Sequence, residues 1–153
     1  MNNSIVNVPE PVNEPIKDYK PNSPEKDSVL ATYKNLKDSN TDIKMWIGGK
    51  FVESSKTSNM SPPHDHKHIL GKYYLAEKKH VEMAIKSSLD AKEKWAGMRW
   101  EERAAIFLKA AELVAGPYRD RINAATMLAQ SKTIFQAEID AACELVDFLK
   151  FNV

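Results

Sequence analysis

The stretch that most constrains the fold is residues 133–153, where apolar side chains cover most of a helical wheel. At 100° per residue one narrow arc contains Gln136, Asp140, Cys143, Asp147 and Lys150. A helix with this pattern is buried around most of its circumference. The pattern runs to Val153 with no glycine, proline or capping residue behind it. We therefore expect the N-terminal part of a longer protein, which alone is marginally stable or self-associates.

Residues 76–153 are predicted to be helical throughout. Apolar residues recur at helical spacing over residues 81–95, 107–114 and 122–129, and the final helix begins near Thr133. Gly97 and the pair Gly116-Pro117 mark the ends of the first two helices, since glycine and then proline typically follow a helix end.

The first half of the chain has less regular patterns. Residues 1–22 contain Pro9, Pro11, Pro15 and Pro21 and predict an extended arm. Residues 23–75 predict a short helix and a small β-hairpin region. The helix begins at Ser23-Pro24 and ends near Lys37. The hairpin has a turn at Gly48-Gly49. Residues 54–65 are predicted to form a polar loop, and residues 68–75 are compatible with a third strand.

Composition narrows the classes of partner. Of the 153 residues, 42% are hydrophobic and 28% are charged. The chain has 22 basic and 21 acidic side chains, which gives a net charge of +1. Because no block of like charges occurs, we expect neither a nucleic-acid nor a membrane partner. The single cysteine cannot form an internal disulfide, and residues 1–20 lack the pattern of a signal or transit peptide. We therefore expect a cytoplasmic protein.

Three alternating histidines, His64, His66 and His68, form a candidate zinc or copper site, because alternation in an extended segment points side chains to one side. The flanking prolines and charges favour a solvated loop instead, and the spacing lacks the paired ligands of dedicated metal sites. We therefore expect no metal, and a histidine-loop metal binder remains the least favoured alternative.

The final helix contains three further candidates. Cys143 has no histidine near it in sequence, so we interpret it as an inert small residue rather than a nucleophile. Glu138 falls inside the apolar arc and needs a partner, for which Arg103 and Lys132 are candidates. Glu144 borders a stripe of small and aromatic residues, and it would bind a ligand only if that stripe faced a cavity. The stripe consists of Ala137, Ala141, Phe148 and Phe151.

The segment Gln136-Ala137-Glu138-Ile139-Asp140-Ala141, within the run 130–152, resembles the L-glutamate γ-semialdehyde dehydrogenase branch of the aldehyde dehydrogenase superfamily. Residues 12–15 with 23–25, residues 61–66 and residues 103–112 resemble the same branch. One departure is Ser131-Lys132-Thr133, where family members often have Gly-Lys-Thr.

The resemblance implies an α/β aldehyde dehydrogenase-like fold, of which this chain is the N-terminal part only, mostly α-helical with a short β-hairpin. Residues 76–153 would be the helical beginning of the NAD-binding domain, ending before its Rossmann-like core. The resemblance to this branch implies oxidation of L-glutamate γ-semialdehyde (1-pyrroline-5-carboxylate) to L-glutamate in proline catabolism, with NAD as cofactor and a catalytic cysteine and glutamate.

The resemblance places these catalytic residues beyond Val153, and Cys143 does not match the nucleophile. It therefore implies that this chain alone is inactive and that the full-length enzyme is a homo-oligomer. Glu144 is the one site residue that it carries over, as a carboxylate for the ammonium group of the substrate. A non-catalytic helical interaction module derived from an aldehyde dehydrogenase is the alternative.

Overall fold

A computed structural model describes residue 5 and residues 7–153 of the chain; the arm predicted for residues 1–22 lies partly outside this range, at residues 1–4 and 6. Four helices occur where the periodicity predicts them: α1 (Pro24–Asp38), α2 (Lys78–Gly97), α3 (Trp100–Ala115) and α4 (Arg119–Gln130). The Ser23 hydroxyl accepts a hydrogen bond from the backbone N–H of Lys26 and caps α1, as predicted. In the described part of the chain, no helix has the length and apolarity needed to cross a bilayer.

The strands form two small sheets. A hairpin joins β2 (Met45–Ile47) to β3 (Lys50–Val52), and its turn residues Gly48 and Gly49 have φ angles of 60° and 77°, as the predicted glycine turn requires. In the other sheet, β5 (Gly71–Tyr74) is the central strand. It pairs in parallel with β1 (Thr41–Ile43) and antiparallel with β4 (Thr57–Met60).

The prediction that residues 54–65 form a loop is therefore wrong in part, because β4 lies inside this range. The sequence Thr57-Ser58-Asn59-Met60 lacks the alternation of apolar and polar residues by which strands are recognised. It becomes a strand through its backbone pairing with β5.

The final helical segment consists of three parts: α5 (Ile134–Ala137), the π-helix η1 (Glu138–Cys143) and α6 (Glu144–Phe151). Its predicted start is confirmed by a capping box between Thr133 and Gln136. The prediction that the helix continues uncapped to Val153 is wrong. It ends at Phe151, and both the backbone N–H and the side-chain amide of Asn152 donate to the carbonyl of Phe148.

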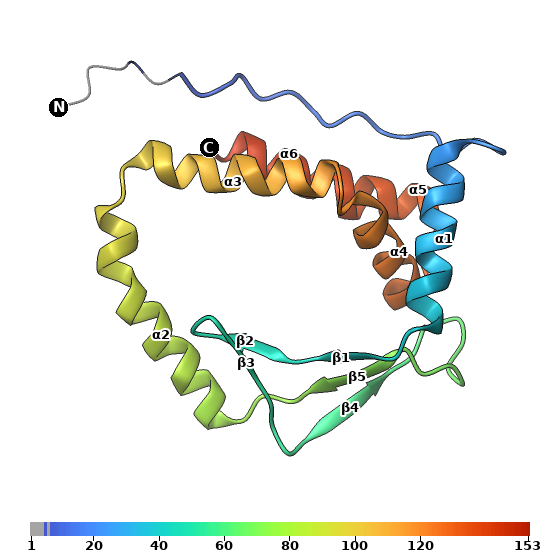
Figure 1. Ribbon diagram of the computed structural model, residues 1–153, viewed down its shortest axis with the longest axis horizontal. Coiled ribbons are helices and arrows are strands. Elements are labelled where there is room, and N and C mark those ends of the chain that lie inside the picture. Colours follow the sequence, from blue (N-terminus) through green and yellow to red (C-terminus); the bar gives the residue numbers. More distant parts are fainter. Residues whose placement is uncertain (1–4, 6) are drawn as a thin grey trace.

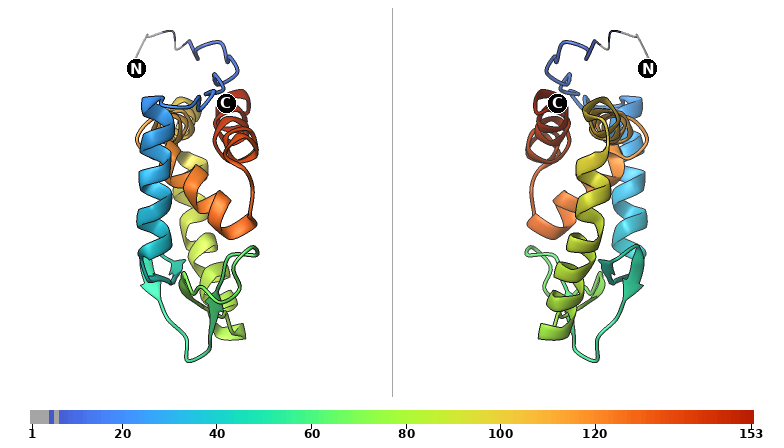
Figure 2. Two further views of the ribbon diagram at one scale, coloured as in Figure 1. Left: turned by 90° about the vertical axis from the view of Figure 1, so that its right-hand side faces the viewer. Right: turned by 90° about the vertical axis from the view of Figure 1, so that its left-hand side faces the viewer.

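Figures 1 and 2 show how these elements are arranged. The helices α3 and α6 lie side by side, and the strands lie at the opposite end of the molecule. Helix α1 packs on α4, while α2 runs from the strands to α3 and packs on β2. Arg103 joins α3 to the end of α2, because its guanidinium donates to the carbonyls of Trp95, Ala96 and Met98.

The apolar residues of α2 are not buried by the described residues. The side chains of Val81, Ile85 and Leu89 are 52%, 55% and 62% exposed. The interior instead consists of residues from α1, α3, α4 and the final helical segment, among them Val29, Ala111, Leu128 and Val146. The core therefore lies on the side of the molecule where the arm runs, as residues 7–20 pass along the layer of α3 and α6 without forming a helix or strand (Figure 1).

Candidate functional site

The most deeply buried charge in the described chain is the carboxylate of Glu138, which has no exposed surface. Its cation is Arg119 at the start of α4, which is only 3% exposed and donates to both carboxylate oxygens. Arg103 and Lys132, the predicted partners, are engaged elsewhere: Arg103 contacts the end of α2, and Lys132 pairs with Asp140. The expectation of an ion pair was correct, but its partner was wrong.

Three more donors converge on the same carboxylate. The backbone N–H of Lys17 donates at 2.8 Å, the hydroxyl of Tyr19 at 2.7 Å and the side-chain amide of Asn123 at 2.7 Å. Burial by itself would raise the pKa of Glu138, but the hydrogen bonds from Arg119 and these donors outweigh it and lower the pKa to about 2. A carboxylate with this pKa stays ionised near neutral pH. Its role is to fasten the arm to the helices.

Cys143 lies beside this ion pair. Burial raises the pKa of its thiol, and the nearby carboxylate of Glu138 raises it further. Because the thiolate is the nucleophilic form, this environment disfavours a nucleophile at Cys143. It supports our interpretation of Cys143 as an inert residue.

Two of the three histidines of the candidate metal site, His64 and His68, have separate partners. His64 lies 2.7 Å from the Ser131 hydroxyl through Nδ1, and His68 lies 2.6 Å from the Lys37 carbonyl through Nε2. Over the part of the chain that the structure describes, no group of three or more His, Cys, Asp or Glu side chains is placed to hold a metal ion. The structure therefore gives the alternative of a histidine-loop metal binder no support.

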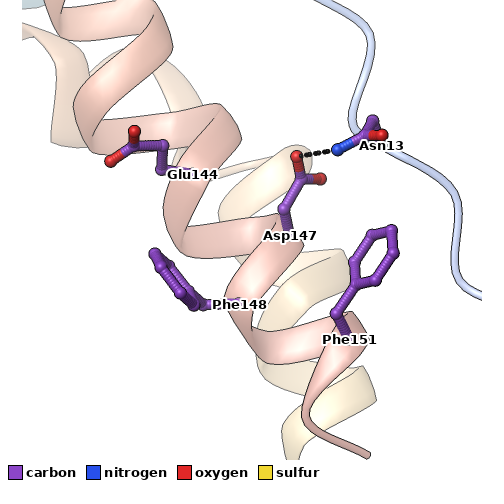
Figure 3. Close-up of a pocket in the computed structure, with 5 residues that line it drawn as sticks. All are labelled: Asn13, Glu144, Asp147, Phe148 and Phe151. Carbon is purple, nitrogen blue, oxygen red and sulfur yellow. Dashed lines mark hydrogen bonds between the residues drawn. The ribbon is translucent and has the colours of Figure 1, made fainter.

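Glu144, the predicted substrate-binding residue, is exposed at the start of α6 and lines a surface hollow of about 300 Å³. The other lining residues are Asn13, Asp147, Phe148 and Phe151 (Figure 3). Glu144 and Phe148 extend from the same side of α6, whereas Asp147 points toward the arm. The hollow therefore combines a free-standing carboxylate with two aromatic rings.

Two features of the hollow differ from the expected stripe. Ala137 is fully buried, and neither Ala137 nor Ala141 lines the hollow. A second carboxylate, that of Asp147, does line it, although its oxygens are occupied: Asn13 Nδ2 and the backbone N–H of Glu14 each donate to it at 2.7 Å. No pattern in the sequence predicted the contact between Asn13 and Asp147, since 134 positions separate them.

Comparison with known proteins gives the family. The model of the aldehyde dehydrogenase family matches residues 51–153, two thirds of the chain. The chain belongs to the aldehyde dehydrogenase family. Within this family, it is 43% identical over 92% of its length to the probable delta-1-pyrroline-5-carboxylate dehydrogenase of Schizosaccharomyces pombe. It is 40% identical, again over 92% of its length, to the human delta-1-pyrroline-5-carboxylate dehydrogenase, which is named as mitochondrial.

Comparison with solved structures supports the same family assignment. The delta-pyrroline-5-carboxylate dehydrogenase of Mycobacterium tuberculosis, crystallised with NAD and cobalamin, superposes with a TM-score of 0.96 at 42% identity over 99% of this chain. The chain covers 29% of that structure and 26% of the Schizosaccharomyces pombe relative, so it spans about a quarter of the proteins that it matches. The predicted fold class, part of the aldehyde dehydrogenase fold, is confirmed.

Proposed function

We propose that this chain is the N-terminal segment of an NAD-dependent dehydrogenase that oxidises L-glutamate γ-semialdehyde, the open form of 1-pyrroline-5-carboxylate, to L-glutamate in proline catabolism. The observation that supports it is the identity of about two fifths, over nearly the whole chain, to relatives named for this reaction. In the reaction the aldehyde loses a hydride to NAD and gains an oxygen from water, which gives a carboxylate, NADH and protons.

Within this segment, we assign substrate recognition to Glu144. The substrate carries an ammonium group besides its aldehyde, and an exposed carboxylate next to aromatic surface can bind such a group through charge-assisted hydrogen bonds. Phe148 and Phe151 provide the aromatic surface in the same hollow. Glu144 therefore selects the amino acid aldehyde over simple aldehydes.

The catalytic cysteine, the catalytic glutamate and the NAD site belong to the part of the enzyme outside this chain. Cys143 is buried beside Glu138 and is not the nucleophile. We assign no residue of this chain to NAD. Residues 76–153 are proposed as the helical beginning of the NAD-binding domain, and the assembled enzyme as a homo-oligomer in the cytoplasm.

The test joins this chain to the remaining three quarters of the Schizosaccharomyces pombe relative, and we call the product the fused enzyme. We expect it to reduce NAD with L-glutamate γ-semialdehyde, and the isolated 153-residue chain to reduce none. NADH formation is followed by absorbance, with the relative's own remaining part alone as the control. A folded fused enzyme without activity, or an isolated chain that reduces NAD, would contradict the proposal.

A further inference from the structure

Helix α6 presents three different faces. Val146, which has no exposed surface, points inward, where α6 packs on α3. On the outer face, Glu144, Phe148 and Phe151 line the hollow together with Asn13 and Asp147, and the two rings are 66% and 51% exposed. Asp147 and Lys150 point toward the arm. Packing on α3 therefore holds the inner face of α6, whereas the two exposed rings of the outer face contribute little to fixing its rotation.

The arm contacts α6 through paired charges. Both oxygens of Asp147 accept hydrogen bonds from the arm, one from Asn13 Nδ2 (Figure 3) and one from the backbone N–H of Glu14. The carboxylate of Glu14 in turn binds Lys150 Nζ at 2.9 Å and Arg119 Nη1 at 2.6 Å. We call Asn13, Glu14, Asp147 and Lys150 the arm clamp. It joins two successive turns of α6 to α4 through the arm.

The π-helix η1 directly precedes α6 and affects the direction in which the side chains of α6 point. In a π-helix the backbone bonds run from i to i+5, so one extra residue turns every later side chain by about 100° relative to a continuous α-helix. The direction of Glu144 therefore depends on where η1 ends and on the contacts that hold α6. Asp147, three positions later, lies about 60° away around the helix and also lines the hollow. A modest rotation of α6 would turn Glu144 away from the aromatic rings and leave Asp147 as the carboxylate beside them.

We propose that Asp147 and Glu14 are positioning residues for substrate recognition: the arm clamp fixes the rotation of α6 so that Glu144 faces the hollow. The inference rests on the proposed role of Glu144. With the clamp intact, the hydrogen bonds of the arm occupy the carboxylate of Asp147, and Glu144 is the carboxylate left to bind the ammonium group. Without the clamp, α6 samples orientations in which Glu144 points away from the substrate.

The test measures selectivity in the fused enzyme, as kcat/KM for L-glutamate γ-semialdehyde divided by kcat/KM for propanal. Asp147→Ala is compared with wild type, with Glu144→Ala and with the double variant. We expect Asp147→Ala to lower the ratio about threefold to tenfold, through a raised KM at little changed kcat. In the Glu144→Ala background the same change should move the ratio less than about twofold, since no carboxylate is left to position.

Controls separate positioning from general damage. Asp90→Ala removes a carboxylate of an exposed pair with Lys86 on α2 and should leave the ratio unchanged. Asp147→Asn keeps the size of the side chain and is expected to give the same loss of selectivity. It replaces Asp147→Ala in the comparison if the alanine variant does not fold. In the fused enzyme, Asp147→Ala should also speed hydrogen exchange at the amide of Glu14, which donates to Asp147.

Three results would overturn the proposal. An equal loss for both aldehydes in Asp147→Ala and Asp147→Asn would show that Asp147 is only structural. A lowered ratio in Glu144→Ala with an unchanged ratio in both Asp147 variants would remove the positioning role and leave the proposed function intact. An unchanged ratio in Glu144→Ala would remove the role of Glu144, and with it anything for the clamp to position.

Discussion

The buried carboxylate of Glu138 shows which features of a site can be predicted from the position of one residue in the sequence. A helical wheel predicts that Glu138 lies on an apolar face and needs a cation. It does not predict which cation, because Arg119 lies 19 positions earlier in another helix, and Tyr19 contributes from 119 positions away. The need for a partner is local, but the identity of the partner depends on tertiary packing.

Glu138 should dominate the acid sensitivity of the chain. Its pKa is about 2 in the folded protein and 4.5 as the unperturbed value, so its stabilisation is present above about pH 4.5 and lost as the pH falls toward 2. Glu138→Gln leaves Arg119 without its main partner and should cost about 3 to 5 kcal/mol at neutral pH. It should also flatten the dependence of stability on pH below 5.

Urea unfolding at several pH values checks this prediction. Asp90→Asn, in an exposed pair, is the matched control and should cost about 0 to 1 kcal/mol. An unfolding free energy of Glu138→Gln that falls between pH 5 and pH 2 as steeply as that of wild type would show that another group carries the acid sensitivity.

Among the elements, helices were predicted well and irregular backbone poorly. The apolar spacing of α2, α3 and α4 repeats with the period of the α-helix, which is a local property of the sequence. The strand β4 is defined by its pairing with β5, and the π-helix η1 carries no distinct residue pattern. The arm clamp was not predictable either, since it joins residues from opposite ends of the chain.

The end of α4 offers a test at this scale. Ser131 follows α4 with a φ of 55°, in the left-handed region that suits glycine, and the family often has glycine there. Ser131→Gly should therefore be about 1 kcal/mol more stable than Ser131→Ala. Both variants lose the contact between the Ser131 hydroxyl and His64, so that loss cancels in the comparison. Thermal melts of the two variants measure the difference, and equal stability would contradict the prediction.

At the scale of the whole molecule, the fold class followed from the resemblance of residues 130–152 rather than from composition. The same resemblance predicted Glu144, whereas spacing alone left it as an edge residue. The structure supplied what neither could provide, which is the hollow that Glu144 shares with Phe148, Phe151 and the arm. It also shows apolar residues of α2 on the surface of the described chain, as expected of a segment that spans a quarter of its relatives.

The most direct measurement is the selectivity of the fused enzyme with and without the carboxylate of Glu144. A charge-assisted hydrogen bond contributes about 1.5 to 3 kcal/mol, so Glu144→Ala should lower kcat/KM for L-glutamate γ-semialdehyde roughly tenfold to a hundredfold. The value for propanal, which lacks an ammonium group, should change little, and Glu144→Gln, which keeps the size of the side chain, should lose most of the same selectivity. An unchanged ratio of the two kcat/KM values in both variants would contradict the assignment of Glu144 to the substrate.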